Sequence, residues 1–377
     1  MVNLTQVKTL NAALLSEASR RGRPLVAVFL GGTSGIGHMT ARTLASSSQQ
    51  AGHAPRIYLV GRSEQRGEQI VEELRGLCPA GTYRFVRAAD LSLLACVDAV
   101  CAEITRLEGR EEEGPRIDYL MTSQGGAIFQ PRKDTTEGLD ATMALLYYSR
   151  MRAIQQLTPL LLQSVLPATV VSVFAAGFED EKKLFLEDLS LRDLQRYSYI
   201  QVRSHLCYMH SMYMSKLAEM HAGDNKQLRL VHIFPGLVLT PAFHNPTYPA
   251  WFRFLFNRIL APFFLAPFVA VDPVESGERM ISLASPALYP AAATSTSTTV
   301  SDNGSSSAES RKGGTVRGMD GRSGSGAYSL DWKGDDAHNR KVYAKYDADG
   351  IEALKQQVWE HTNKAFEVIA TGKPFTE

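Results

Sequence analysis

The sequence predicts an α/β fold in which helices cover both faces of one doubly wound parallel sheet. Short runs rich in β-branched and aromatic residues alternate with longer segments of helical spacing along most of the 377 residues. The runs are continuously apolar rather than alternating, which is typical of strands buried on both faces. Strand and helix in regular alternation favour a parallel sheet, because each parallel pair of strands needs a crossover connection.

The elements follow in order along the chain. The predicted strands are residues 25–30, 56–60, 83–88, 117–123, 169–175 and 228–234. Helical spacing runs over residues 38–50, 68–77, 94–109, 138–163 and 205–222. The first 24 residues form an amphipathic helix pattern without the long apolar core of a signal peptide. Residues 327–332 predict a last edge strand, and residues 349–369 a C-terminal amphipathic helix.

One stretch does not fit this alternation. Residues 291–326 are dominated by Ser, Thr and Gly. Such a composition buries too little apolar surface to offset the entropy lost on ordering, so we expect a disordered surface insertion. Because it precedes the last strand, residues 1–290 and 327–377 are expected to form a single domain.

Composition excludes several classes of function. Lys and Arg number 40 against 39 Asp and Glu, so a formal charge of +1 gives no field that would attract nucleic acid. The four cysteines show no CxxC pair and no His/Cys cluster, which predicts free thiols in a reducing, cytoplasmic compartment and no metal site. No run reaches the ~18 apolar residues that a membrane span needs.

A glycine-rich loop follows the first predicted strand and opens the next helix. In "FLGGTSGIG", Gly31 allows a tight turn, Gly35 lets the backbone approach a pyrophosphate, and Gly37 lets the helix pack on the strand. The helix N-terminus then offers unpaired N–H groups to phosphates. Strand, loop and helix in this order predict a dinucleotide site of the Rossmann type, formed by Gly31, Thr33, Ser34, Gly35, Ile36 and Gly37.

The end of the second predicted strand bears on the choice of cofactor. An acidic residue there would hold the ribose 2′-hydroxyl of NAD, but the sequence has Arg62, with Arg66 further on. An arginine at this place suits a 2′-phosphate, so NADP is favoured over NAD.

These motifs, with four others, resemble the short-chain dehydrogenase/reductase family over about residues 24–290 and again from Gly326. "RAADLS" resembles the pair that contacts adenine, here Asp90 and Leu91. "TSQGG" stands where the family has Asn-Asn-Ala-Gly, which gives Gln124 and Gly125. "TVVSVFAAG" resembles the strand of the catalytic serine. "HIFPGLVLT" resembles the loop over the nicotinamide and gives Pro235, Gly236 and Thr240.

The long stretch before "YSYI" looks most like the retinol-dehydrogenase-like branch of that family. Fungal members of similar sequence are often associated with secondary-metabolite gene clusters, which is an association and not chemistry. The resemblance implies an oxidoreductase whose chemistry uses four groups: a tyrosine acid/base, a lysine that lowers its pKa, a serine that orients the substrate oxygen, and an asparagine that holds a water.

Only the tyrosine is retained among these four groups, and the serine and the asparagine are two of the three that are replaced. The serine falls three residues before Gly177, where the sequence has Phe174. Ser172 points the same way but lies about 6.6 Å further back along the strand, so it is either a displaced catalytic serine or a core serine. The asparagine position falls at or near Leu146, with no amide close by.

The tyrosine has two candidates in "YSYIQVRSH". Tyr199 is followed one helical turn later by Arg203, whose permanent charge would lower the pKa of a nearby phenol. Tyr197 is followed by the uncharged Gln201. Both assignments stay open here, with Tyr199 and Arg203 favoured as a substitute pair.

The segment after Thr240 is strongly aromatic over residues 241–271. In the family this segment closes over the substrate, so a lid for a bulky apolar molecule is one interpretation. Core or homo-oligomer contact is a second interpretation. A helix lying on a membrane surface is a third, because arginines flank the apolar residues.

The sequence therefore favours an NADP-dependent oxidoreductase that acts on a carbonyl or alcohol of a bulky apolar metabolite. The replaced catalytic residues leave two alternatives: a non-redox isomerase or cyclase on the same fold, and a catalytically inactive NADP-binding protein.

Overall fold

The computed structural model describes residues 3–126, 130–164, 166–222, 228–239, 270–292 and 315–377, together with Phe254 and Arg258. In these residues seven strands form one sheet in the order β3-β2-β1-β4-β5-β6-β7, and every neighbouring pair is parallel. The strands are β1 (Val26–Leu30), β2 (Arg56–Gly61), β3 (Thr82–Arg87), β4 (Tyr119–Thr122), β5 (Ala168–Val173), β6 (Leu228–Ile233) and β7 (Ala327–Leu330).

The doubly wound sheet predicted from the sequence is confirmed. All six predicted strands form, and residues 327–330 add the edge strand beside β6. The chain order reverses between β1 and β4, which are adjacent in the sheet. Ligands of such sheets bind at the carboxyl ends of the strands near this switch point.

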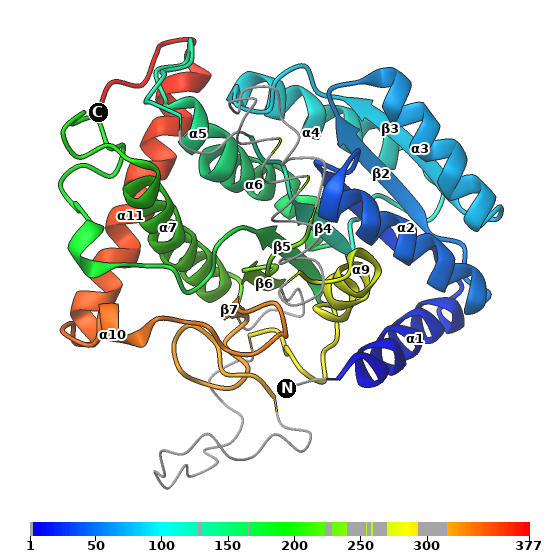
Figure 1. Cartoon of the computed structure of the whole chain (residues 1–377). Helices are drawn as coiled ribbons and strands as arrows, with labels where there is room; N and C mark the ends of the chain where they lie inside the picture. Colours follow the sequence, from blue (N-terminus) through cyan, green and yellow to red (C-terminus); the bar gives the residue numbers. More distant parts are fainter. Residues whose placement is uncertain are drawn as a thin grey trace, which may run out of the picture.

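Helices cover both faces of the sheet (Figure 1). One face carries α4 (Leu94–Glu108), α6 (Ser149–Leu161), α7 (Tyr199–Met220) and α11 (Ala348–Ala370), whose apolar side chains share one core with the sheet. The other face carries α1 (Leu4–Arg20), α2 (Gly35–Gln50), α3 (Glu64–Leu77) and α9 (Pro273–Ser282), which share a second core. The remaining helical turns are α5 (Ala141–Met143), η1 (Ala144–Tyr148), η2 (Glu181–Lys183) and α10 (Arg340–Tyr343).

Two helices differ from their predicted bounds in ways that matter for function. The helix predicted over 138–163 contains a π-helical turn, η1, which includes Leu146 at the family's asparagine position. Such turns interrupt the regular hydrogen bonding and are frequent at functional sites. The helix predicted over 205–222 begins earlier, at Tyr199, because the Ser198 side chain accepts a hydrogen bond from the Gln201 N–H and caps it.

Part of the predicted insertion is folded. Val316 is buried and donates its backbone N–H to the Leu288 carbonyl at 2.9 Å, and Met319 is buried against the core. The C-terminal boundary of the predicted insertion at residue 326 is therefore too late. Residues 293–314, and nearly all of the aromatic segment 241–271, lie outside the described residues.

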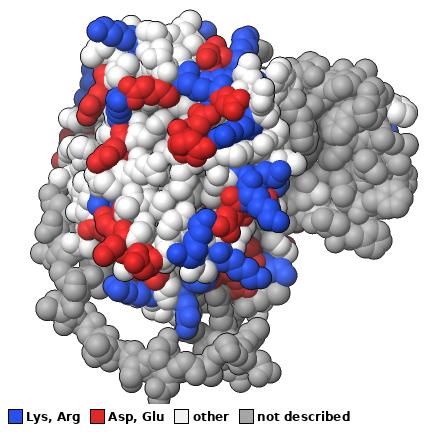
Figure 2. All heavy atoms as spheres, turned by 90° about the vertical axis from the view of Figure 1, so that its left-hand side faces the viewer, with Lys and Arg blue, Asp and Glu red and all other residues white. Residues whose placement is uncertain are grey.

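Two expectations from composition concern membrane-spanning helices and the distribution of surface charge. Among the described residues, the structure contains no helix that is long and apolar enough to cross a membrane. Figure 2 shows acidic and basic side chains interspersed over the face that it presents, without a large patch of one sign.

Candidate cofactor and active site

The glycine loop lies at the carboxyl end of β1 and is tightly packed against the loop that follows β4. Gly31 and Gly35 adopt positive φ values of 87° and 57°, which favour glycine. A Cβ on Gly31 would lie 2.6 Å from the Gln124 nitrogen, and a Cβ on Gly37 would lie 2.5 Å from the Ser123 hydroxyl. The two loops therefore approach each other closely, and side chains at these glycines would separate them.

The N-terminus of α2 is open toward a ligand. Ser34 takes the N-cap position in an extended conformation, yet its side chain makes no capping hydrogen bond. Ile36 is partly buried and packs on the second core. No side chain of the described residues thus caps the first N–H groups of α2, which is the arrangement that dinucleotide sites use for the pyrophosphate.

Two arginines stand beside this loop at the end of β2. Arg62 is exposed directly after the strand. Arg66, in the first turn of α3, donates its Nε–H to the Thr33 carbonyl at 2.9 Å, so its guanidinium is held against the glycine loop. Arg62 is the main cofactor contact expected from the sequence, and the contact of Arg66 with the glycine loop becomes evident only in the folded chain.

The loops after β3 and β4 carry the other predicted cofactor contacts. The Asp90 carboxylate accepts hydrogen bonds from the backbone N–H and the hydroxyl of Ser92, at 2.9 and 2.7 Å, and Leu91 is buried. Asp90 lines a cavity of about 290 Å³ that also reaches Gly126, Asp140 and Leu146. Gly125, next to Gly126, is exposed. These residues share the carboxyl edge of the sheet with the glycine loop.

The loop after β6 also lies at this edge. Gly236 has a φ of 73°, and a Cβ there would lie 2.8 Å from the Val271 side chain and 3.1 Å from Trp332. Pro235 is partly buried beside it. Thr240 lies outside the described residues.

A buried polar cluster that was not predicted from the sequence lies behind this edge, between β5 and α7. Arg150 of α6 is 1% exposed and donates to the Gln124 carbonyl at 2.7 Å, the Val173 carbonyl at 2.8 Å and the Ser172 hydroxyl at 3.0 Å. Among the described residues, no carboxylate pairs with it. Burial lowers the pKa of Arg150 to about 9, so it remains charged at neutral pH and ties the ends of β4 and β5 together.

Ser172 belongs to this cluster. Its hydroxyl lies 3.0 Å from His210 Nε2, and His210 Nδ1 lies 2.6 Å from the Leu206 carbonyl. The Nδ1–H of His210 therefore donates to that carbonyl, and Nε2 accepts a hydrogen bond from the Ser172 hydroxyl. Burial, with the charge of Arg150, lowers the pKa of His210 to about 3, so the ring is neutral.

The Phe174 side chain packs against the residues of this cluster. Its ring stacks on His210 with centroids 5.8 Å apart and on His232 at 6.3 Å, and the Arg150 guanidinium carbon lies 5.8 Å from its centroid. Ser172 is fully buried beneath it. This geometry favours the interpretation of Ser172 as a core serine over that of a displaced catalytic serine.

Tyr197 and Tyr199 have different surroundings. The Tyr197 hydroxyl donates to the Asp140 carboxylate at 3.1 Å. Burial and this negative charge raise the pKa of Tyr197, which is opposite to the effect of the family's lysine. Tyr199 is partly buried at the first position of α7.

Arg203 lies one turn further along α7 at the edge of the sheet. Its guanidinium carbon lies 4.7 Å from the centroid of Phe178, which packs edge-to-face on Phe234 with centroids 4.9 Å apart. Phe234 directly precedes the Pro235–Gly236 loop. The buried Nε of Arg203 has no hydrogen-bond partner among the described residues. The positive charge of Arg203 thus lies between the ends of β5 and β6, and its Nε–H can still donate a hydrogen bond.

No protein-family model matches the chain. It is 36% identical to Oxidoreductase AN1596 of Emericella nidulans over 96% of this chain and 97% of that protein. It is 37% identical to Short-chain dehydrogenase/reductase SAT2 of Stachybotrys chartarum over 63% of this chain and 66% of that protein. Retinol dehydrogenase 12 of Mus musculus is 24% identical over 63% of this chain and 68% of that protein.

Proposed function

The chain belongs to the short-chain dehydrogenase/reductase family of oxidoreductases, and from that premise we propose that it reduces a ketone, or oxidises the corresponding alcohol, of a bulky apolar metabolite with NADP. The fungal origin of its oxidoreductase relatives is compatible with a substrate from secondary metabolism.

The glycine loop is the observation that carries this proposal. The close approach of Gly31 and Gly37 to the loop after β4, together with the uncapped N-terminus of α2, fits a pyrophosphate and adjoining ribose. When bound, the nicotinamide would supply or accept the hydride. The chain's own residues would hold the cofactor at the carboxyl edge, orient the substrate oxygen and handle the proton.

The two arginines after β2 support NADP. Arg62 is exposed where an acidic residue would bind the NAD ribose. Arg66 is anchored at the glycine loop by its Nε, and its terminal nitrogens make no hydrogen bond within the described parts of the chain. We assign both to the 2′-phosphate, with Arg66 as the preorganised member of the pair.

Tyr199 and Arg203 are proposed as the proton-transfer pair. They lie one helical turn apart on the same face of α7, so the guanidinium can favour the deprotonated phenol and stabilise a developing alkoxide. The contact of Tyr197 with Asp140 disfavours the competing assignment. Aromatic side chains at the same edge, Phe174, Phe178 and Phe234, supply described surface for an apolar substrate.

A fluorescence titration tests the first half of this proposal. NADPH added to the protein should show saturable enhancement or quenching, and NADH should bind more weakly. The second half is tested by turnover of hydrophobic ketones followed through NADPH consumption. Loss of turnover in Tyr199→Phe, with NADPH affinity kept, is the expected result. Full turnover in both Tyr199→Phe and Tyr197→Phe would show that neither phenol transfers the proton.

A second candidate function has one observation in its favour. Phe174 and Leu146 replace the family's serine and asparagine, and the nearest serine is buried. These changes remove substrate-orienting groups but leave the glycine loop intact, as a catalytically inactive NADP-binding protein would require. Tight NADPH binding without turnover of any ketone or alcohol in a broad panel would favour this function.

A further inference from the structure

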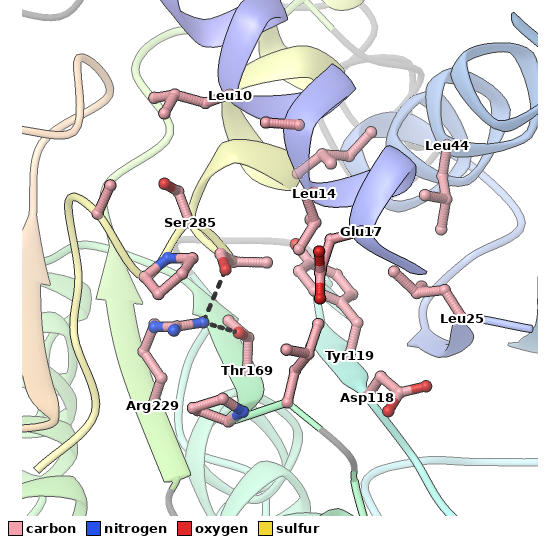
Figure 3. Close-up of a pocket in the computed structure, with 17 residues that line it drawn as sticks. Leu10, Leu14, Glu17, Leu25, Leu44, Asp118, Tyr119, Thr169, Arg229 and Ser285 are labelled. Atoms are coloured by element: carbon pink, nitrogen blue, oxygen red, sulfur yellow. Dashed lines mark hydrogen bonds between the residues drawn. The ribbon is translucent and has the colours of Figure 1, made fainter. Parts of the chain in front are cut away.

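An apolar cavity lies at the amino-terminal edge of the sheet, opposite the glycine loop. Its volume is about 220 Å³, and it opens between α1, α9 and the residues that begin the strands (Figure 3). Leu25 precedes β1, Asp118 precedes β4, and Thr169 and Arg229 stand at the second positions of β5 and β6. The cofactor loops all lie at the other ends of these strands, so this cavity is separate from the candidate active site.

Most of its wall is made of aliphatic side chains. Leu10 and Leu14 come from α1, Leu44 from α2 and Ile281 from the end of α9, and Ala284 follows that helix. A dry cavity of about 150 Å³ lined by such side chains is known to bind benzene in another protein. A larger apolar cavity has room for about two fused rings, and filling it would restore dispersion contacts that its walls lack when empty.

The polar groups of the cavity limit the kind of ligand. Arg229 is 1% exposed and donates to the Tyr289 carbonyl. It also donates to the Thr169 hydroxyl at 2.6 Å and to the Ala284 carbonyl at 2.9 Å (Figure 3), so that all three acceptors are uncharged. No ion pair joins it to a carboxylate in the described parts of the chain. The buried charge of Arg229 is therefore only partly compensated, and an acceptor oxygen on a ligand would stabilise it further.

Two carboxylates line the same cavity and disfavour an anion. Asp118 accepts the Val26 N–H at 2.8 Å and the Ser164 hydroxyl at 2.5 Å, and Glu17 pairs with Arg20 and Arg21 on the surface of α1. An anionic ligand would meet the Asp118 carboxylate, which is largely buried and so little screened by solvent, and also the partly exposed Glu17. A neutral ligand with a single oxygen meets neither difficulty.

We propose that this cavity is a binding site for a neutral, apolar molecule of about two fused rings that carries one acceptor oxygen. The apolar body fills the space beneath α1, and the oxygen lies at the Arg229–Thr169 end. The site is independent of the cofactor and of the proposed reaction.

Chroman is a suitable probe, because it has two fused rings and one ether oxygen and offers no carbonyl to reduce. Tetralin replaces that oxygen with a methylene group, and chroman-2-carboxylate adds a negative charge. Isothermal titration of the full chain should give one chroman site, at least fivefold weaker binding of tetralin, and no binding of the carboxylate. NADPH should leave the chroman stoichiometry unchanged.

Matched substitutions on α1 locate the site. Ala13 lines the cavity and is exposed at its rim, whereas its exposed neighbour Ala12 does not line it. Ala13→Phe should abolish chroman binding, and Ala12→Phe should leave it unchanged. Ala287→Phe, at the exposed far rim, provides a second blocking variant if the first perturbs α1. Absence of chroman binding up to its solubility limit, or binding that survives both blocking variants, would overturn the proposal.

Discussion

Replacing Gly37 with alanine tests the cofactor loop most sharply. The added Cβ would lie 2.5 Å from the Ser123 hydroxyl and 2.6 Å from the Gly31 carbonyl, where ordinary contacts begin at 3.4 Å. One of the two loops must therefore move by about 0.8 to 0.9 Å. Overpacking of this kind costs about 1–3 kcal/mol. If the displacement is borne by the cofactor site, NADPH affinity falls roughly 5- to 150-fold.

NADPH fluorescence titration measures this loss, and circular dichroism checks that the variant is folded. Gly76→Ala is the matched control, because a Cβ on Gly76, which is exposed on α3, meets no atom within 4 Å. That variant should bind NADPH as the parent does and gain about 0.5–1 kcal/mol of stability. A folded Gly37→Ala protein with unchanged NADPH affinity would refute the reasoning about this loop.

Three further predictions follow from the same geometry. Arg66→Ala should weaken NADPH binding about tenfold or more and NADH binding by less than twofold, with Arg62→Ala showing a smaller change in the same direction; equal losses for both cofactors, measured by titration, would remove the 2′-phosphate assignment. Tyr199→Phe should lower ketone turnover by about 10²-fold or more, the range of general acid catalysis, while Tyr197→Phe keeps most of it; the reverse pattern in kcat would move the assignment to Tyr197. Acidification from pH 6.5 to pH 4.5 should destabilise the fold. Burial lowers the folded-state pKa values of His205, His210, His338 and His361, so these rings take up protons on unfolding, and each adds a slope of up to about 1.4 kcal/mol per pH unit to the free energy of unfolding. A flat profile of urea unfolding midpoints over this range would contradict the buried, neutral state of these four rings.

The sheet could be predicted because its signals are local. Each buried strand reads as a continuous apolar run, and the glycine loop carries its turn and close-approach requirements within seven residues. Even β7, which follows the Ser/Thr/Gly-rich stretch, was recognisable from residues 327–332. The end of that stretch was misplaced, since Val316 packs through a hydrogen bond to Leu288, 28 positions earlier in the chain, and composition does not report such contacts.

The polar cluster behind the site depends on contacts that no local pattern contains. Arg150, Ser172 and His210 come from α6, β5 and α7, and they meet only when the three elements pack together. A partial signal was present in the sequence. Arg150 shares its helical face with the apolar Tyr147 and Ile154, where a buried network is one of few physically acceptable explanations for a cation.

The register of the tyrosine motif shows the same limit. Spacing alone left Tyr197 and Tyr199 as alternatives, because either could follow the long loop after β5. The structure adds the Asp140 carboxylate next to Tyr197, whereas Arg203 one turn after Tyr199 was already evident from the spacing. These neighbours have opposite effects on a phenol, so the comparison between them carries the assignment of the proton-transfer pair.

The central claim is that the family's cofactor site is kept while proton transfer has moved to Tyr199 and Arg203. A crystal structure of the chain with NADP and a bound ketone or alcohol tests it most directly. The account predicts the pyrophosphate at the N-terminus of α2, and the Tyr199 hydroxyl within about 3 Å of the substrate oxygen, with the Arg203 guanidinium beside it. A substrate oxygen held by Tyr197, or a cofactor bound away from the glycine loop, would contradict it.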